Sequence, residues 1–137
     1  MIQFYLLAVV MNILGGMFMA APLLEGRMPA LQGVQEALKI NIASRIILIL
    51  VSLVVGVFKI LSVTAGDVAV VGDLLPALGL LVIAAVFFLD YYTEQAEVRT
   101  GIIETLQKIF IGNKKTIGIV LIVVGLLHFL FPGVLFL

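Results

Sequence analysis

Residues 46–63 read IILILVSLVVGVFKILSV, eighteen residues with a single charge, Lys59. A helix needs about 20 mainly apolar residues to cross the hydrocarbon core of a membrane. Fourteen of the eighteen residues are Ile, Leu, Val or Phe. Each of these favours membrane insertion by roughly 0.3 to 0.6 kcal/mol, and together they outweigh the penalty of about 3 kcal/mol for a central lysine. The stretch therefore predicts a transmembrane helix despite its lysine.

Three further apolar runs have the length of a membrane span, at residues 2–24, 74–92 and 117–137. The first lacks the basic residues that open a signal peptide, so we expect it to remain as a span. Hydrophobic residues make up 64% of the 137-residue chain and charged residues 12%, whereas soluble domains have about half and a quarter. The predicted fold class is all-α: a polytopic membrane protein whose single domain, residues 1–137, is a four-transmembrane-helix bundle.

The positions of lysine and arginine predict how the bundle is oriented. Seven of the eight basic residues lie in the two connecting segments 25–45 and 93–116, and the eighth is Lys59. Because cytoplasmic loops are enriched in basic residues, we predict that both segments are cytoplasmic and that both termini lie outside. The expected location is a cytoplasmic (inner) or plasma membrane.

Each predicted cytoplasmic loop contains apolar residues at helical spacing, in residues 29–42 and 100–111. Such amphipathic helices could lie in the headgroup region with their basic residues near anionic lipid. They could also cap the bundle or dock a partner. The simplest interpretation is that they are ordered connectors resting on the membrane.

The second and fourth apolar runs resemble each other. Residues 51–61, VSLVVGVFKIL, align with residues 120–130, VLIVVGLLHFL, and this register pairs Lys59 with His128. Upstream, Glu25-Gly26-Arg27 resembles Glu97-Val98-Arg99.

These similarities indicate two halves, residues 1–66 and 67–137, each made of a span, a basic loop and a span. Two-span units keep their orientation when repeated, so the halves would form parallel repeats about an axis along the membrane normal. Val, Leu, Ile and Gly also recur by chance in any membrane helix. The duplication is therefore a hypothesis.

Lys59 and His128 are the first candidates for an intramembrane ligand site. Lys59 lies fourteen residues after Arg45, which is about 21 Å along a helix. His128 lies thirteen residues after Lys115, so both residues are predicted at nearly the same height. One interpretation is a cationic pocket, open to the outside, for an anion, a carboxylate or a lipid headgroup. The other is that Lys59 extends to the outer headgroups and His128 bonds a carbonyl group.

Asn12 is the third candidate and the deepest strongly polar residue. It belongs to a row of small residues spaced four apart in the first span. Small residues let membrane helices approach closely, and an asparagine amide can bond across such a contact. Packing is the interpretation favoured here over a ligand role. The residues predicted to pack helices together are Ala8, Gly16, Ala20, Ser52, Gly56, Gly118 and Gly125.

Acidic residues near the ends of the spans are weaker candidates. Asp90 could be a proton-coupling carboxylate, but its position near Glu94 favours a place on the solvated cytoplasmic face. Asp67 and Asp73 flank the outer loop, and we expect them to cap helix ends.

Composition narrows the functional classes. The chain has no cysteine and one histidine, which rules out disulfides, thiol chemistry and a multi-histidine metal site within one chain. We predict no catalytic residue, no metal site and no cofactor. The two basic loops also contain glutamates and do not form a nucleic-acid surface.

Three functions remain. The first is intramembrane packing, as a homo-oligomer or as an accessory subunit of a membrane complex, with the lipid bilayer and other membrane proteins as partners. The second is a small channel or transporter for an anion or small polar solute that uses Lys59, His128 and Asn12. The third is a lipid-modifying enzyme, for which one histidine and one deep asparagine are a poor basis. The sequence therefore favours a non-enzymatic role.

Overall fold

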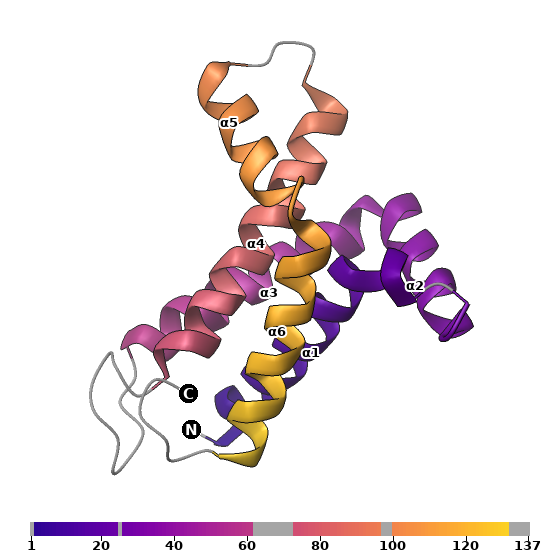
Figure 1. Cartoon of the computed structure of the whole chain (residues 1–137). Helices are drawn as coiled ribbons and strands as arrows, with labels where there is room; N and C mark the ends of the chain where they lie inside the picture. The colour runs from indigo at the N-terminus through magenta and orange to yellow at the C-terminus, as the bar shows by residue number, and fades with distance from the viewer. Residues whose placement is uncertain (1, 25, 62–72, 97–99, 132–137) are drawn as a thin grey trace.

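The computed structural model describes residues 2–24, 26–61, 73–96 and 100–131, and within them the fold is all-α (Figure 1). The helices in chain order are α1 (Ile2–Leu24), α2 (Pro29–Ile40), α3 (Ile42–Leu61), α4 (Leu74–Gln95), α5 (Gly101–Phe110) and α6 (Lys114–Leu130). Asp67 lies outside these residues, as do residues 64–72 of the predicted outer loop (64–76) and the Glu97-Val98-Arg99 motif.

Three of the helices, α1, α3 and α4, are long and apolar enough to cross a membrane. The pair α5 and α6 passes the same test only together, and the two are bent by 56° at their junction. Helix α6 alone has 17 residues, or about 25 Å, somewhat less than a hydrocarbon core of about 30 Å. The described residues therefore contain three candidate spans, or up to four if the bent pair is one span.

The helix boundaries follow local capping rather than hydropathy alone. Helix α3 begins at Ile42, four residues before the apolar run, because the Asn41 side-chain oxygen accepts hydrogen bonds from the N–H groups of Ala43 and Ser44 at 3.0 and 3.3 Å. A side-chain acceptor at this position satisfies N–H groups that have no partner within the helix. Helix α4 ends at Gln95, three residues past the predicted end at Tyr92, and the N–H of Ala96 still bonds to the carbonyl oxygen of Tyr92.

The long helices pack as two close pairs, α1 along α6 and α3 along α4, and α1 also contacts α4 (Figure 1). The core lies between them and is built mainly from α1 and α4, with Met19, Leu80 and Ile83 almost fully buried. Gly16 and Gly118 face each other so closely that a methyl group on either would overlap the other's carbonyl oxygen. All seven residues predicted to pack helices are buried.

The two loop segments with amphipathic patterns form helices α2 and α5. Pro29 occupies the first turn of α2, where its missing N–H leaves no helical bond unmade. Helix α5 contacts the C-terminal end of α4, beyond the main bundle (Figure 1). None of its described residues is buried, and Ile102 is 74% exposed. The exposed surface of α5 is therefore partly apolar.

Candidate functional site

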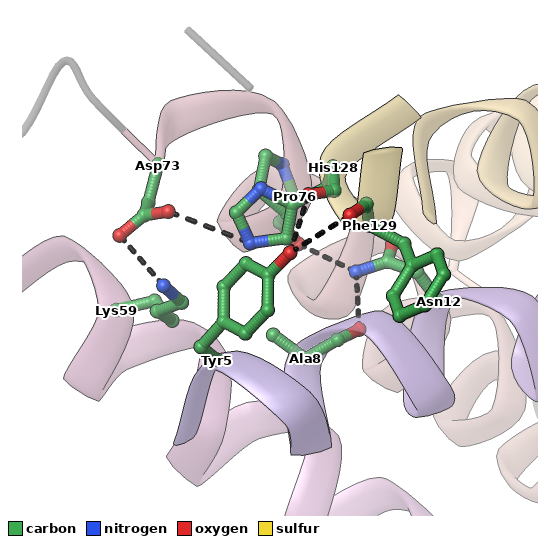
Figure 2. A network of polar contacts seen from close by, with 8 residues as sticks. All are labelled: Tyr5, Ala8, Asn12, Lys59, Asp73, Pro76, His128 and Phe129. Carbon is green, nitrogen blue, oxygen red and sulfur yellow. Dashed lines mark hydrogen bonds and ion pairs between the residues drawn. The ribbon is translucent and has the colours of Figure 1, made fainter. Parts of the chain in front are cut away.

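Four polar residues, one from each long helix or from the residue just before it, form a group that we call the ionic cluster (Figure 2). Its members are Tyr5 of α1, Lys59 of α3, Asp73 immediately before α4, and His128 of α6. Three of them are buried and the fourth, Tyr5, is partly buried. Lys59 Nζ donates a hydrogen bond to Asp73 Oδ2 at 2.6 Å. The second carboxylate oxygen of Asp73 lies 3.5 Å from His128 Nε2. One carboxylate thus faces nitrogen atoms from two other helices.

The ammonium group of Lys59 is buried, and its neighbours are a carboxylate and an aromatic ring. Its side chain is 3% exposed, and that of Asp73 is 8% exposed. The ammonium nitrogen also lies 5.5 Å from the centre of the Tyr5 ring, within the range of a cation–π interaction. Lys59 therefore points into the bundle, toward a carboxylate and an aromatic face, rather than away from it.

Asp73 occupies the N-cap position of α4, and its backbone carbonyl accepts the N–H of Ala77 at 3.1 Å. Its side chain makes no capping hydrogen bond. The prediction that this side chain caps the helix is therefore wrong. The fold brings Lys59 within reach instead, and its ammonium group adds the attraction of an opposite charge to the hydrogen bond that the carboxylate accepts.

Tyr5 joins α1 to α6 at the same level. Its hydroxyl donates to the backbone carbonyl oxygens of His128 at 2.7 Å and of Phe129 at 3.3 Å. Its ring lies 4.7 Å from the fully buried imidazole of His128. Sequence reasoning missed Tyr5, although it lies seven residues before Asn12 and so on the same face of a helix. That spacing was the available signal.

Asn12 lies deeper and makes a separate contact between α1 and α4 (Figure 2). Its side-chain NH₂ group donates to the carbonyl oxygens of Ala8 at 2.9 Å and Pro76 at 3.0 Å. Within the part of the chain that the structure describes, its side-chain oxygen accepts no hydrogen bond. Any side chain at Gly79 would overlap that oxygen. The fold thus brings Lys59 and His128 together around Asp73, whereas Asn12 lies about two turns from Tyr5 along α1.

Asp90, the weaker candidate, lies near the other end of α4. Its carboxylate accepts a hydrogen bond from Lys114 of α6, and one turn further along Glu94 pairs with Arg45 of α3. The Lys114 ammonium also lies over the ring of Phe87, 5.5 Å from its centre. Asp90 therefore links two helices in this structure, and its proposed part in proton coupling stays a prediction.

Fold and site together define an all-α chain with three to four candidate membrane-spanning helices and a buried ionic cluster to which all four long helices contribute. A protein-family model matches residues 1–128, so the chain belongs to that family, whose function is unknown. Comparison with curated proteins gave no match. Comparison with solved structures likewise gave none.

Proposed function

We propose that α1, α3, α4 and α6 each cross the membrane, which makes the chain a four-span integral membrane protein. Beyond α6 the sequence stays apolar, with residues 131–137 reading FPGVLFL. Arg45 and Lys114, which belong to the basic segments 25–45 and 93–116, pair with Glu94 and Asp90 at one end of α4, so this end is cytoplasmic under the positive-inside rule. The ionic cluster then lies toward the outer side of an inner or plasma membrane.

The absence of cysteine makes this orientation directly testable. Single cysteines at Val70 and Gln107 should react with a membrane-impermeant thiol reagent from the outside and the inside, respectively. Intact cells or right-side-out vesicles provide one arm, and inverted vesicles provide the other. The reverse labelling pattern would refute the orientation.

We propose further that the ionic cluster receives a small anion or small polar solute from the outer side, as part of a small channel or transporter. The observation that carries this proposal is the gathering of Lys59, Asp73 and His128 at buried positions, beside the partly buried Tyr5 of α1. Ionisable residues within a membrane are costly and usually mark a functional site.

Helix packing alone does not account for the ionic cluster. Close approach in this bundle is already achieved by small residues such as Gly16 and Gly118. A buried ion pair is often no better for stability than well-packed apolar side chains of similar volume. A bundle that needed only to hold its helices together would therefore have little use for Lys59 and Asp73 at one buried point.

Ligand-dependent thermal stability in lipid nanodiscs tests this proposal. A panel of carboxylates, phosphate, amino acids and sugars should contain a class that raises the melting temperature of the native chain. Lys59→Met should abolish that response, whereas the matched change Lys114→Met near the other end of α4 should retain it. If no solute affects the native chain, or if Lys59→Met still responds, the proposal fails.

A second candidate function is packing, as a homo-oligomer or as an accessory subunit of a membrane complex. The observation that favours it is the exposed side of α3, which buries a smaller share of its residues than α1 or α4. Ile47, Leu50 and Phe58 are all at least half exposed on this helix. Lipid or another subunit would cover them. Native mass spectrometry from nanodiscs distinguishes lipid from another subunit. If the chain is a monomer without partners, only lipid covers the exposed side of α3.

We also propose that residues 1–66 and 67–137 are copies of one two-span unit. In the packed helices, Gly15 lies against Ile83, and the two carbonyl acceptors of the Asn12 amide belong to Ala8 and Pro76. Both pairs are 68 positions apart. A twofold axis between α1 and α4 would place equivalent residues in contact in this way.

The same relation extends to the ionic cluster. Tyr5 and Asp73 are also 68 positions apart, and Lys59 and His128 are 69 apart. Exchanging α1 with α4 and α3 with α6 turns the close pair α1–α6 into the other close pair, α4–α3. The offset of 72 between the Glu25 and Glu97 motifs differs from 68 by four residues, about one helical turn, so it keeps the same face. Each half would then supply two equivalent positions to the ionic cluster.

A further inference from the structure

The ionic cluster already holds one carboxylate, that of Asp73. Lys59 Nζ binds one of its oxygens at 2.6 Å, and His128 Nε2 faces the other at 3.5 Å. The Tyr5 ring borders the ammonium group. Two nitrogen atoms, one on α3 and one on α6, are thus placed to address both oxygens of a single carboxylate, and the group they hold comes from the chain itself.

The Asp73 side chain is not tied to the start of α4. The backbone carbonyl of Asp73, not its carboxylate, bonds to the first turn of the helix through the N–H of Ala77. Rotation of the side chain about its own bonds would therefore release the carboxylate while the backbone bond to the first turn stays in place.

Charge balance limits what could replace this carboxylate. Lys59 and Asp73 neutralise each other at a site where the lysine side chain is 3% exposed. A neutral or cationic solute that displaced Asp73 would leave a buried ammonium without a counter-ion, which is strongly unfavourable. A monovalent carboxylate replaces the lost charge beside Lys59 one for one and matches the positions of both nitrogen atoms, and the exchange requires the displaced Asp73 carboxylate to turn outward at the start of α4 and be solvated there.

We propose that the ionic cluster is an exchange site for a small monocarboxylate, at which the incoming carboxylate group displaces Asp73 from Lys59 and His128. This inference rests on the proposed solute-binding function and specifies its ligand class. Asp73 then acts as the counter-ion of Lys59 whenever the site is empty of solute.

The single histidine of the chain provides a specific probe. Protein labelled with ¹⁵N-histidine gives the imidazole signals of His128 alone. In phosphatidylcholine nanodiscs, acetate should shift these signals in the native chain in a saturable manner. Asp73→Ala removes the carboxylate that acetate would have to displace. In this variant acetate should shift the His128 signals at lower concentration and raise the melting temperature by on the order of 5 °C at saturation.

Two control variants accompany this measurement. Asp73→Asn keeps the volume of the side chain but removes its charge, so acetate should displace the amide more readily than the native carboxylate and shift the His128 signals at lower concentration. In Asp90→Ala, acetate should not raise the melting temperature, because water can reach the Lys114 side chain, which is 27% exposed. If Asp73→Ala fails to fold, the native chain and Asp73→Asn still decide the question through the His128 signals.

The outcomes separate this inference from the function on which it rests. A native chain that responds to phosphate or sugars but not to acetate overturns the inference and spares the solute-binding function. A native chain that responds to no solute overturns both. A response confined to Asp73→Ala means that Asp73 is a fixed counter-ion, which also overturns the exchange. Phosphatidylserine nanodiscs without acetate form the last arm: a His128 shift there supports a lipid headgroup as the source of the carboxylate.

Discussion

The two ends of α4 carry acidic residues that bind a basic residue of a neighbouring helix, but the surroundings of these pairs differ. At the first end, the side chains of Lys59 and Asp73 are 3% and 8% exposed. Near the other end, those of Lys114 and Asp90 are 27% and 20% exposed. In the neighbouring pair the side chain of Glu94 is 55% exposed, although that of Arg45 is only 6% exposed. Each pair of the second group thus has at least one clearly exposed side chain, whereas both side chains of the first pair are nearly inaccessible.

This difference changes what each pair contributes. Exposed ion pairs are screened by solvent and are typically worth about 0–1 kcal/mol. Removing one partner of a buried pair leaves an uncompensated charge and costs about 3–5 kcal/mol. The pairs near the cytoplasmic end of the proposed topology therefore help to align helices, whereas the ionic cluster is a place where a charge must always be balanced.

The largest expected effect comes from removing the lysine at each end. Lys59→Ala leaves the Asp73 carboxylate buried without its ammonium partner and should lower the free energy of unfolding by about 3–5 kcal/mol. Lys114→Ala should lower it by about 1 kcal/mol or less, because water can solvate Asp90. Denaturation of both variants in the same mixed micelles measures the difference. Equal losses would mean that burial does not distinguish the two ends.

A smaller effect is expected from filling the space beside Asn12. A methyl group in Gly79→Ala overlaps the Asn12 side-chain oxygen, so the variant should lose about 1–3 kcal/mol. Gly101→Ala is the matched control, because nothing lies within 4 Å of the added methyl group. That variant should be unchanged or slightly more stable. If Gly79→Ala is as stable as Gly101→Ala, the close contact between α1 and α4 is not as described.

Swapping the residues at positions 59 and 128, which the proposed repeat makes equivalent, tests that repeat. Either single change, Lys59→His or His128→Lys, alters the charge around Asp73. In the double variant the lysine and the histidine have only traded places, and Asp73 again faces one of each. We expect the double variant to recover about half or more of the stability lost by the worse single variant, a coupling within the range of contacting residues. Strictly additive losses in thermal denaturation would argue against equivalent positions.

The smallest effect concerns salt. The Debye length falls from about 10 Å at 0.1 M salt to about 3 Å at 1 M, and exposed pairs are screened more than buried ones. Raising sodium chloride over this range should reduce the small destabilisation by Lys114→Ala toward zero. The destabilisation by Lys59→Ala should stay nearly constant. Melting temperatures of the two variants, each relative to the native chain at equal salt, provide the measurement, and a matching salt dependence would remove the distinction between the ends.

Much of the fold could be predicted from the sequence because hydropathy and helical periodicity are local properties. The apolar runs at 2–24, 46–63 and 74–92 correspond to α1, α3 and α4, and the amphipathic patterns in the loops correspond to α2 and α5. The all-α class and the presence of long apolar helices are confirmed. The fourth span stays a proposal, because α6 as described has 17 residues and its continuation lies outside the described part of the chain.

Only part of the candidate site could be predicted from the sequence. Lys59 and His128 were predicted at the same height, because a helix rises a fixed 1.5 Å per residue. Asp73 was recognised at the start of α4, but its side chain was assigned to a helix cap. Tyr5 was missed, since an aromatic residue near the end of an apolar run resembles many others in membrane helices.

By itself, the sequence determined which segments are helical and at what depth along each helix the polar residues lie. Only the tertiary structure decided that α6 packs on α1 and α3 on α4, and therefore that Lys59, His128 and Tyr5 meet around the Asp73 carboxylate. The physical reason is that most sides of a membrane helix are apolar, so hydropathy does not specify which side faces which neighbour. Side-chain shape and a few polar bonds select the arrangement, and both act between residues that are far apart in the chain.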